Sequence, residues 1–308
     1  MNNMNIDSWI EKDSFEFSEP ENCVEEVHFQ RNFWVSFWSG IKENKLAMIC
    51  IFFLGIILLA SVFASLSPYD PNATNISNVF AQPSGKHFFG TDDLGRDYFT
   101  RCLYGGRVSI AVGVFSMIVS IIIGTLYGSI SGFIGGKVDD FLMRVLDILM
   151  AIPSMLLIII INSIINANTI TMIFTIGIFS WMSVARIVRA ETLSIKERDY
   201  VTAARNLGVS NVQVIFKHII PNVAAPIIVA STINVARAIL MESSLSYIGY
   251  GVKVPMASWG SMLQNAQSYI IHRPMLAVYP GVLILMTVLS LNFLGDVLRN
   301  VLEPRLMK

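Results

Sequence analysis

Charged side chains are scarce in this chain, and their scarcity excludes an ordinary soluble domain. Lysine, arginine, aspartate and glutamate make up 14% of the 308 residues, hydrophobic residues make up 54%, and the mean hydropathy is +0.59. A soluble domain typically carries about 25% charged residues. The deficit indicates that lipid surrounds most of the chain. The 22 basic and 22 acidic residues cancel, so the net charge predicts no nucleic-acid partner.

The residue patterns of catalytic and metal sites are also missing. Cys23, Cys50 and Cys102 are odd in number and far apart, which predicts neither a disulfide framework nor a zinc site. The four histidines are scattered without metal-ligand spacing. The stretch GFIGGKV at 132–138 lacks the first glycine and the final Ser or Thr of a phosphate-binding loop. We therefore expect no cofactor, no metal, and no ATP hydrolysis by the chain itself.

Long apolar runs, in contrast, are abundant. A helix needs roughly 20 apolar residues to cross about 30 Å of hydrocarbon. Six runs meet this criterion: 46–66, 108–130, 141–165, 170–188, 223–241 and 275–298. The first run follows the mostly polar residues 1–45, which predicts an uncleaved anchor and not a secretory signal. The expected fold class is an all-α membrane protein with six transmembrane helices.

The distribution of lysine and arginine predicts the orientation in the membrane. With the N-terminus inside, the outer segments hold six of the 22 basic residues: Lys86, Arg96, Arg101, Arg107, Lys253 and Arg273. Arg237 lies within a span, which leaves 15 inside. Basic residues concentrate in cytoplasmic loops, so both termini are expected in the cytoplasm. The predicted segments are a cytoplasmic tail 1–45, an anchor helix 46–66, an extracytoplasmic loop 67–107, and a five-helix core 108–308 that contains a cytoplasmic loop 186–222.

The cytoplasmic loop 186–222 carries the signals of two short helices joined at a glycine. Ser194 and Glu197 have the spacing of a capping box, which predicts a helix start near Ile195. Gly208 is a natural residue to end that helix. One apolar stripe is expected along it, formed by Tyr200, Ala203, Ala204 and Leu207.

A second helix is expected directly after this glycine. Ser210 and Gln213 form another capping box, and Pro221 is expected to end the helix. Its predicted apolar face consists of Val212, Ile215, Phe216 and Ile219. A helix–Gly–helix elbow without a catalytic group predicts a docking surface for a partner that supplies energy.

Two other interpretations of the elbow remain open. The stretch AARNLGVSNVQVI has the spacing of a DNA-binding helix-turn-helix, with Ala204, Gly208 and Val214 at the usual positions. The close membrane spans and the apolar second helix count against this interpretation. The elbow also fits an amphipathic connector that lies on the membrane.

Small residues recur at every fourth position of the second span. The row consists of Ser116, Ser120, Gly124, Gly128 and Gly132. Such rows let two helix backbones approach closely in lipid. We therefore expect a tight helix–helix contact here, with a partner in this chain or in another.

Three residues in the spans are candidates for a translocation pathway. Pro153 lies mid-span and is expected to kink its helix. Arg237 lies within the fifth span and Glu242 near its outer end, and charged groups in hydrocarbon usually face a cavity or a partner. These two are five positions apart and do not share a helix face. Arg144 lies three positions before Asp147 and four after Asp140, so these charges are expected to neutralise each other locally.

The elbow resembles the EAA loop of the permease subunits of ABC importers. The matching residues are Ala203-Ala204, Gly208 and Ile219-Ile220-Pro221, while Thr202 stands where the family usually has Glu. In that family the loop forms a coupling helix that docks into a groove of the ATPase. The resemblance implies these coupling residues: Asp199, Thr202, Ala203, Ala204, Gly208 and Pro221.

Three further segments are similar to the C-type subunit of the oligopeptide, dipeptide and nickel permeases, namely 89–110, 147–153 and 242–263. The resemblance covers the chain from about residue 45 to its end. It implies a type I ABC importer permease fold in a bacterial or archaeal cytoplasmic membrane, with peptides as substrates and alternating access as mechanism. Nickel or a metal chelate is the alternative substrate.

The same resemblance implies a set of partners. They are a homologous second permease, two ABC ATPases that bind ATP and magnesium, and an extracytoplasmic substrate-binding protein. A free-standing channel or secondary transporter is the alternative of another class. It would need ionisable groups at mid-membrane or two inverted halves with broken helices, and the sequence shows neither clearly.

Overall fold

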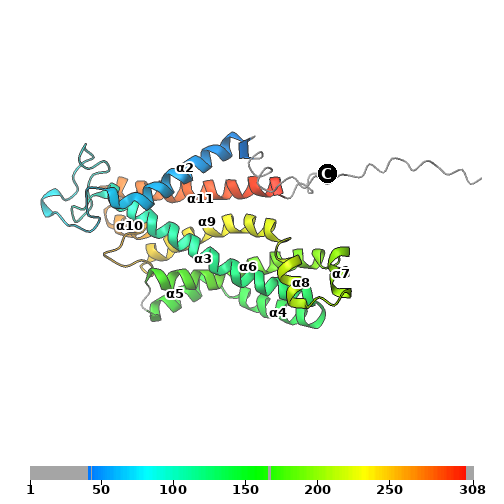
Figure 1. Cartoon of the computed structure of the whole chain (residues 1–308). Coiled ribbons are helices and arrows are strands. Elements are labelled where there is room, and N and C mark those ends of the chain that lie inside the picture. The colour runs from blue at the N-terminus through cyan, green and yellow to red at the C-terminus, as the bar shows by residue number, and fades with distance from the viewer. Residues whose placement is uncertain (1–40, 43, 166–167, 303–308) are drawn as a thin grey trace, which may run out of the picture.

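The computed structural model describes residues 41–42, 44–165 and 168–302. The predicted tail 1–45 lies almost entirely outside these residues. Within them, every regular element is a helix (Figure 1). Five helices are long and apolar enough to cross a membrane, and a sixth crossing results if one bent pair counts as a single span. This agrees with the six predicted spans.

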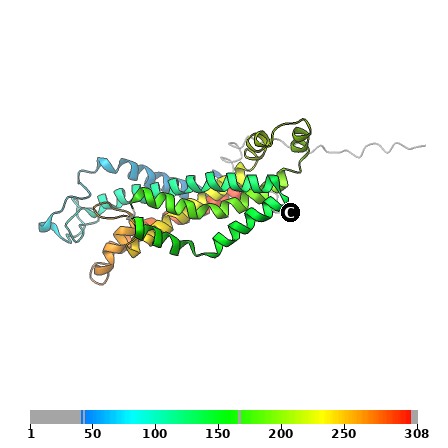
Figure 2. The same ribbon diagram turned by 90° about the horizontal axis from the view of Figure 1, so that it is seen from below.

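The main helices run back and forth between two ends of the molecule. They are α2 (Lys45–Val62), α3 (Tyr98–Ile134), α4 (Gly136–Ala151), α5 (Ser154–Ile165), α6 (Thr169–Ile195), α9 (Ala224–Ile248) and α11 (Met275–Leu302). The short helices α7 (Asp199–Asn206) and α8 (Asn211–Val214) stand at one end, and the loop after α2 lies at the opposite end (Figure 2). The short helix α10 (Trp259–Ala266) lies at the same end as that loop. With the basic residues inside, α7 and α8 lie at the cytoplasmic end.

Helix α3 begins earlier than the hydropathy predicts. It starts at Tyr98 and not near residue 108, so it has 37 residues and the outer loop is shorter than 67–107. Asp97 is its N-cap, and the Asp97 carboxylate accepts a hydrogen bond from the Thr100 amide at 2.8 Å. Hydropathy marks where lipid begins, whereas a helix begins at its cap.

The small-residue row of α3 packs against α6 of the same chain. A Cβ atom added to Gly124 would lie 2.6 Å from the Val184 Cβ, and one added to Gly132 would lie 2.8 Å from the Arg189 carbonyl oxygen. Ser116 belongs to the same row and donates a hydrogen bond across the interface, to the Ile173 carbonyl. The predicted tight contact is confirmed, and its partner is internal.

The third predicted span is broken where Pro153 stands. Helices α4 and α5 meet there at 73°, because proline cannot continue the hydrogen-bond ladder of a helix. The local pair predicted for Arg144 and Asp147 is wrong. The Asp147 carboxylate binds Arg186 of α6 at 2.7 Å, since the fold brings α6 alongside α4.

A second ion pair ties α4 to α6 more deeply. Arg189 binds Asp139 at 2.5 Å, and Asp139 is only 4% exposed. The Ser131 hydroxyl donates a further hydrogen bond to Asp139 at 2.6 Å. The start of α4 is thereby fixed to both α3 and α6 at the cytoplasmic end.

Buried ion pairs organise the outer loop. The Arg96 guanidinium binds the Asp92 carboxylate at 2.7 Å, and Arg101 approaches the same carboxylate at 3.5 Å. Arg101 is 1% exposed and also donates to the Pro71 carbonyl at 2.8 Å. The mixed charges of this segment therefore form a buried network at the start of α3.

Asp92→Ala is expected to destabilise this outer loop strongly. The substitution leaves two buried guanidinium groups short of a counterion, and breaking a buried pair typically costs about 3–5 kcal/mol. The measurement is the thermal unfolding midpoint of the purified protein. Asp93→Ala is the matched control, because Asp93 is 28% exposed and lies 3.6 Å from Arg96. Equal midpoints for the two variants would contradict the prediction.

Candidate functional site

The elbow at the cytoplasmic end consists of α7, α8 and a π-helical turn at Ile215–Ile219. The predicted helix start near Ile195 is wrong. Helix α6 continues through Ser194 to Ile195, and its last backbone bond joins the Lys196 amide to the Thr192 carbonyl at 3.0 Å. The next helix begins at Asp199.

Gly208 ends α7 in the left-handed conformation, as predicted. Its φ angle is +80°, and the Val209 amide donates to the Ala204 carbonyl at 3.1 Å. The Gly208 amide donates to the Arg205 carbonyl at 3.0 Å. Together these bonds form a Schellman motif, which satisfies the last carbonyls of the helix. A Cβ atom at Gly208 would meet nothing within 4 Å, so the backbone angle alone favours glycine here.

The second capping signal is also confirmed. Ser210 is the N-cap of α8, and its hydroxyl oxygen accepts a bond from the Gln213 amide at 3.4 Å. Helix α8 has four residues before the π-helical turn, which leaves no regular recognition helix of the kind that a DNA-binding motif uses. Pro221 lies exposed in the turn before α9.

The apolar side chains of the elbow point in two directions. Ile215 and Ile219 are buried, whereas Val212 is 64% exposed and Phe216 is 56% exposed. The predicted single face is therefore wrong, because the π-helical turn and the adjoining bundle divide it. The buried half joins one hydrophobic cluster with α3, α6 and α9, formed by Phe133, Val184, Val188, Ile195, Val201, Val214, Ile215, Ile219 and Val223.

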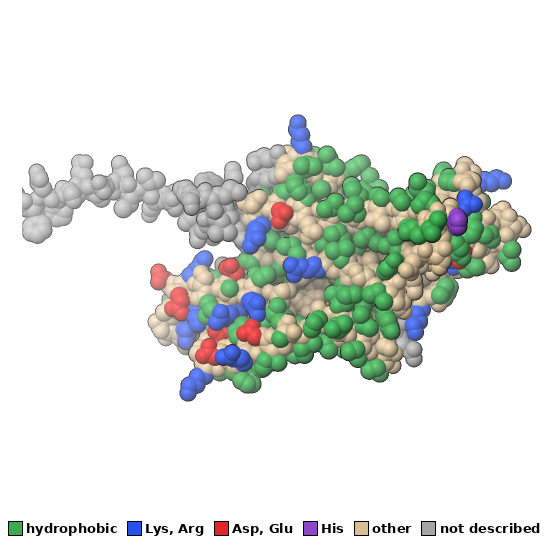
Figure 3. Space-filling view, turned by 180° about the vertical axis from the view of Figure 1, so that it is seen from behind, with side chains coloured by type: hydrophobic (Ala, Val, Ile, Leu, Met, Phe, Trp, Pro, Cys, Tyr) green, Lys and Arg blue, Asp and Glu red, His purple; other side chains and the backbone are tan. Residues whose placement is uncertain are grey.

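The outward half of the elbow is an exposed surface that mixes apolar and basic side chains. Leu207 is 84% exposed, and Tyr200 is 40% exposed. Among the predicted coupling residues, Ala204 is half-buried and the rest are exposed: Asp199, Thr202, Ala203, Gly208 and Pro221. Figure 3 shows charged side chains gathered at this end, while hydrophobic side chains dominate the middle of the same face.

A cavity of about 390 Å³ opens at the break between α4 and α5. Pro153 and Arg237 both line it, so two predicted pathway residues are brought together. Glu242 is not among its lining residues. The complete lining is Met150, Ile152, Pro153, Ser154, Phe179, Ser180, Met182, Ser183, Asn234, Arg237 and Met241.

Arg237 is exposed into this cavity near the middle of α9. Within the described part of the chain it makes no hydrogen bond or ion pair. An unpaired cation at mid-membrane is costly and usually faces water or a partner. The cavity therefore has an electropositive wall.

Glu242 lies at the outer end of α9 and is completely buried. Its carboxylate accepts hydrogen bonds from the Ser109 hydroxyl at 2.8 Å and from the Ser246 hydroxyl at 2.7 Å. Ser109 also accepts a bond from the Trp259 amide at 3.2 Å, which connects α3, α9 and α10. The sequence did not predict that Ser109 and Ser246 surround this carboxylate, because Ser109 is 133 residues away from Glu242 along the chain.

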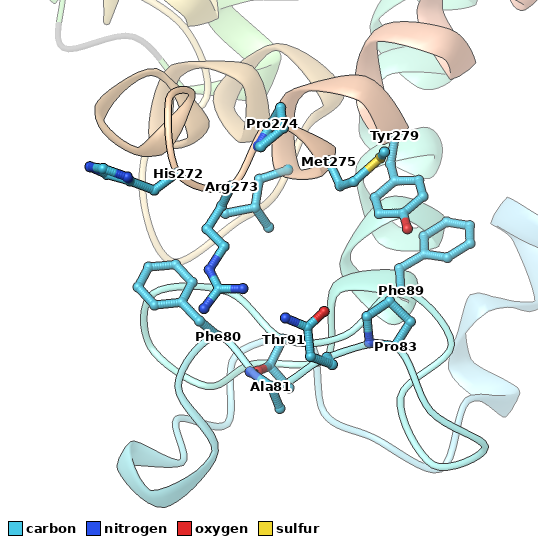
Figure 4. A pocket seen from close by; sticks show the side chains of 12 residues that line it. Phe80, Ala81, Pro83, Phe89, Thr91, His272, Arg273, Pro274, Met275 and Tyr279 are labelled. Carbon is cyan, nitrogen blue, oxygen red and sulfur yellow. The ribbon is translucent and has the colours of Figure 1, made fainter.

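A second cavity, of about 200 Å³, lies at the outer end between the loop and the start of α11 (Figure 4). Arg273 lies over the Phe80 ring at 5.6 Å, and Phe89 stacks on Tyr279 with ring centroids 4.2 Å apart. His272 points away from the labelled cluster in Figure 4. Among the described residues, no group of three His, Cys, Asp or Glu side chains could hold a metal ion.

The helical bundle and the broken span define a multi-pass membrane protein. The chain belongs to the family described as binding-protein-dependent transport system inner membrane component, whose model matches residues 124–308. A second model, the N-terminal transmembrane domain of oligopeptide transport permease C, matches residues 32–83. The predicted membership in the C-type peptide permeases of ABC importers is confirmed.

Curated relatives cover most of the chain. It is 40% identical over 276 residues to the oligopeptide transport system permease protein OppC of Bacillus subtilis, covering 89% of this chain and 90% of that protein. It is 38% identical to the dipeptide permease protein DppC of Alkalihalophilus pseudofirmus, with 89% and 90% covered. It is also 38% identical to the glutathione permease protein GsiD of Shigella flexneri, with 89% and 91% covered.

A solved structure shares the fold. The inward-facing MetNI methionine ABC transporter matches with a TM-score of 0.54 and 18% identity, covering 65% of this chain and 96% of that chain. This chain therefore has the type I ABC importer permease fold that the resemblance implied.

Proposed function

We propose that this chain is the C-type permease subunit of an ATP-driven importer that moves peptides across a bacterial cytoplasmic membrane. The relatives named above are permeases for oligopeptides, dipeptides and glutathione. Their common chemistry is a short peptide with at least one free carboxylate. The cavity residues Pro153 and Arg237 then belong to a path that opens alternately to the two sides.

The proposed assembly contains a homologous second permease, two ABC ATPases and an extracytoplasmic binding protein. ATP and magnesium are bound and hydrolysed by the ATPases. The exposed Leu207, Val212 and Phe216 of the elbow support this assignment, because exposed apolar side chains that gather in one place mark interaction sites. The proposed docking residues are Asp199, Thr202, Ala203, Ala204, Gly208 and Pro221.

One observation carries the coupling role. A single hydrophobic cluster joins the elbow to α3, α6 and α9, with Val201, Val214 and Ile219 each at 0% exposure. A displacement of the exposed half of the elbow by a bound partner would therefore move α3, α6 and α9 together. Coupling of this kind needs a packed element with two discrete arrangements, here the inward-open and outward-open bundles.

Crosslinking tests this proposal. A cysteine at Ala204, in a protein without Cys23, Cys50 and Cys102, is expected to crosslink to an ATPase in the assembled complex. Ile76→Cys is the matched control, because Ile76 is 88% exposed in the outer loop and would face the opposite side of the membrane. A product from Ile76, or none from Ala204, would overturn the docking role.

A further inference from the structure

The cavity at the α4–α5 break combines four groups that favour an anion and contains no acidic side chain. Arg237 supplies a guanidinium with no partner in the described part of the chain. The other groups are the Asn234 amide, the Ser154 hydroxyl and the start of α5. We propose that this cavity is a transit site for the carboxylate of the peptide. The proposal rests on the peptide-import function and names the chemical group that the pathway recognises.

The side-chain amide of Asn234 supports the carboxylate site independently of any charge. It is 6% exposed and lines the cavity, yet its side-chain amide makes no hydrogen bond within the described part of the chain. The amide atoms are not enclosed by protein, so they are open to the cavity and available to a ligand. Asn234 lies three positions before Arg237, so both side chains share one face of α9. A carboxylate bound by Arg237 would supply the missing acceptor.

The break at Pro153 contributes a helix terminus. Helix α5 begins at Ser154, and the Leu156 amide already bonds to the Pro153 carbonyl at 3.1 Å. The first amide groups of a helix have no partner within it, and its N-terminal end carries partial positive charge. Broken membrane helices direct such ends at anionic groups of substrates. Here Ser154 places the start of α5 on the wall of the cavity that holds Arg237.

Ser180 and Ser183 line the same cavity as hydrogen-bond acceptors. Their hydroxyls donate to the backbone carbonyls of Ile176 at 2.7 Å and of Ser180 at 3.1 Å. The hydroxyl oxygens remain free to accept, which suits the N–H groups of a peptide backbone. The volume of about 390 Å³ lies within the usual range for small ligands. The cavity thus presents hydrogen-bond donors to a carboxylate on the side of Arg237 and Asn234. It presents acceptors to peptide N–H groups at Ser180 and Ser183.

Asp147 is the acidic residue of α4 that lies closest in sequence to the break, and it does not neutralise Arg237. Asp147 is paired with Arg186 at 2.7 Å and is not part of the lining. A carboxylate of the second permease is the rival partner. Such a fixed pair would hold the two permeases together regardless of the substrate, whereas a transit site acts only on substrates that carry a carboxylate.

The first experiment compares uptake of trialanine with uptake of its C-terminal amide in proteoliposomes that contain the whole purified complex. Arg237→Gln is expected to lower trialanine uptake about tenfold or more, because a charge-assisted bidentate bond is lost. It is expected to leave uptake of the amide at the wild-type level. Arg237→Lys keeps the charge without the planar fork and should be intermediate.

Arg144→Gln is the matched control, because Arg144 is an exposed arginine on α4 outside the cavity. Each variant is compared with wild type for the same peptide, so selection by the binding protein cancels. An equal loss for both peptides, no loss for either, or loss of the second permease from the complex would overturn the proposal.

A second measurement does not depend on transport. Ser183→Cys, with the three native cysteines replaced, is treated with an anionic and a cationic methanethiosulfonate reagent. Arg237→Gln is expected to lower the ratio of anionic to cationic reaction rates about tenfold, because it removes the local cation. An unchanged ratio would refute an anion-selective cavity. If wild type takes up no trialanine, the import function fails, while the ratio still decides the chemistry of the cavity.

Discussion

Replacing Gly208 with valine is expected to abolish ATP-driven uptake while the complex still assembles and hydrolyses ATP. Gly208 has a φ angle of +80°, and a left-handed residue other than glycine costs roughly 1–2 kcal/mol, with β-branched residues worst. The surrounding space is open, so the strain is relieved by rotation of α8 against α7. The exposed half of the elbow would then no longer match its partner.

Uptake and ATPase rate of the same reconstituted complex are the two measurements for this variant. Gly208→Asn is the matched control, because asparagine tolerates the left-handed conformation and should retain most of the uptake. Normal uptake by the valine variant with normal assembly would refute the coupling role of the elbow. Equal loss in both variants would indicate that the side chain itself, and not the backbone angle, is harmful.

Gly128→Ala is expected to destabilise the permease by roughly 1–3 kcal/mol, as overpacking of a tight core does. A Cβ atom at Gly128 would lie 2.9 Å from the Val188 Cβ and 2.9 Å from the Arg189 amide nitrogen. These atoms belong to the backbone or to a stiff β-branched side chain, so they cannot move aside without separating α3 from α6. The measurement is the temperature at which the purified protein loses its monodisperse state.

Gly55→Ala provides a control of opposite sign. Gly55 lies within α2, and an added Cβ atom would meet nothing within 4 Å. Because alanine favours a helix over glycine by about 1 kcal/mol, this variant should be neutral or more stable. Destabilisation of similar size at both positions would show that helix flexibility, and not close packing, requires the glycines.

The sequence alone predicted the features that depend on local chemistry or on a long periodic pattern. Five of the six apolar runs are single spanning helices and the sixth is the bent pair α4–α5. The small-residue row forms the α3–α6 interface. The roles predicted for Gly208 and Ser210 were correct, because a left-handed helix terminus and a side-chain N-cap depend mainly on the residue at that position. The kink predicted at Pro153 was correct, because proline has no backbone N–H group and breaks the hydrogen bonds of a helix in any fold.

The wrong predictions were those that a neighbouring helix decides. Ser194 has the spacing of a cap, yet the long helix α6 continues through it and overrides the local signal. Asp147 has a possible partner on its own helix, but α6 presents Arg186 at 2.7 Å. Ile215 and Phe216 follow one another in sequence, and only the position of the bundle determines which of them is buried.

The cavity was predictable only in part. Arg237 and Pro153 were recognisable as unusual residues for a membrane helix, so both were candidates. Asn234, Ser180 and Ser183 are ordinary residues in the sequence, and they gain meaning only because α6 and α9 meet at the break of the third span. The hydrogen bond from Ser109 to the buried Glu242 carboxylate was likewise not predictable, because no local sequence pattern connects these two residues.

Helix α3 has a consequence for communication between the two faces of the membrane. At 1.5 Å per residue its 37 residues span roughly 55 Å, and the helix carries the buried Arg101 near its outer end and Phe133, which packs against the elbow, near its cytoplasmic end. A coupling that this helix transmits between a site outside and a site inside acts equally in both directions. In the proposed assembly, any factor by which nucleotide changes the affinity for the binding protein outside equals the factor by which the bound protein changes the nucleotide affinity inside.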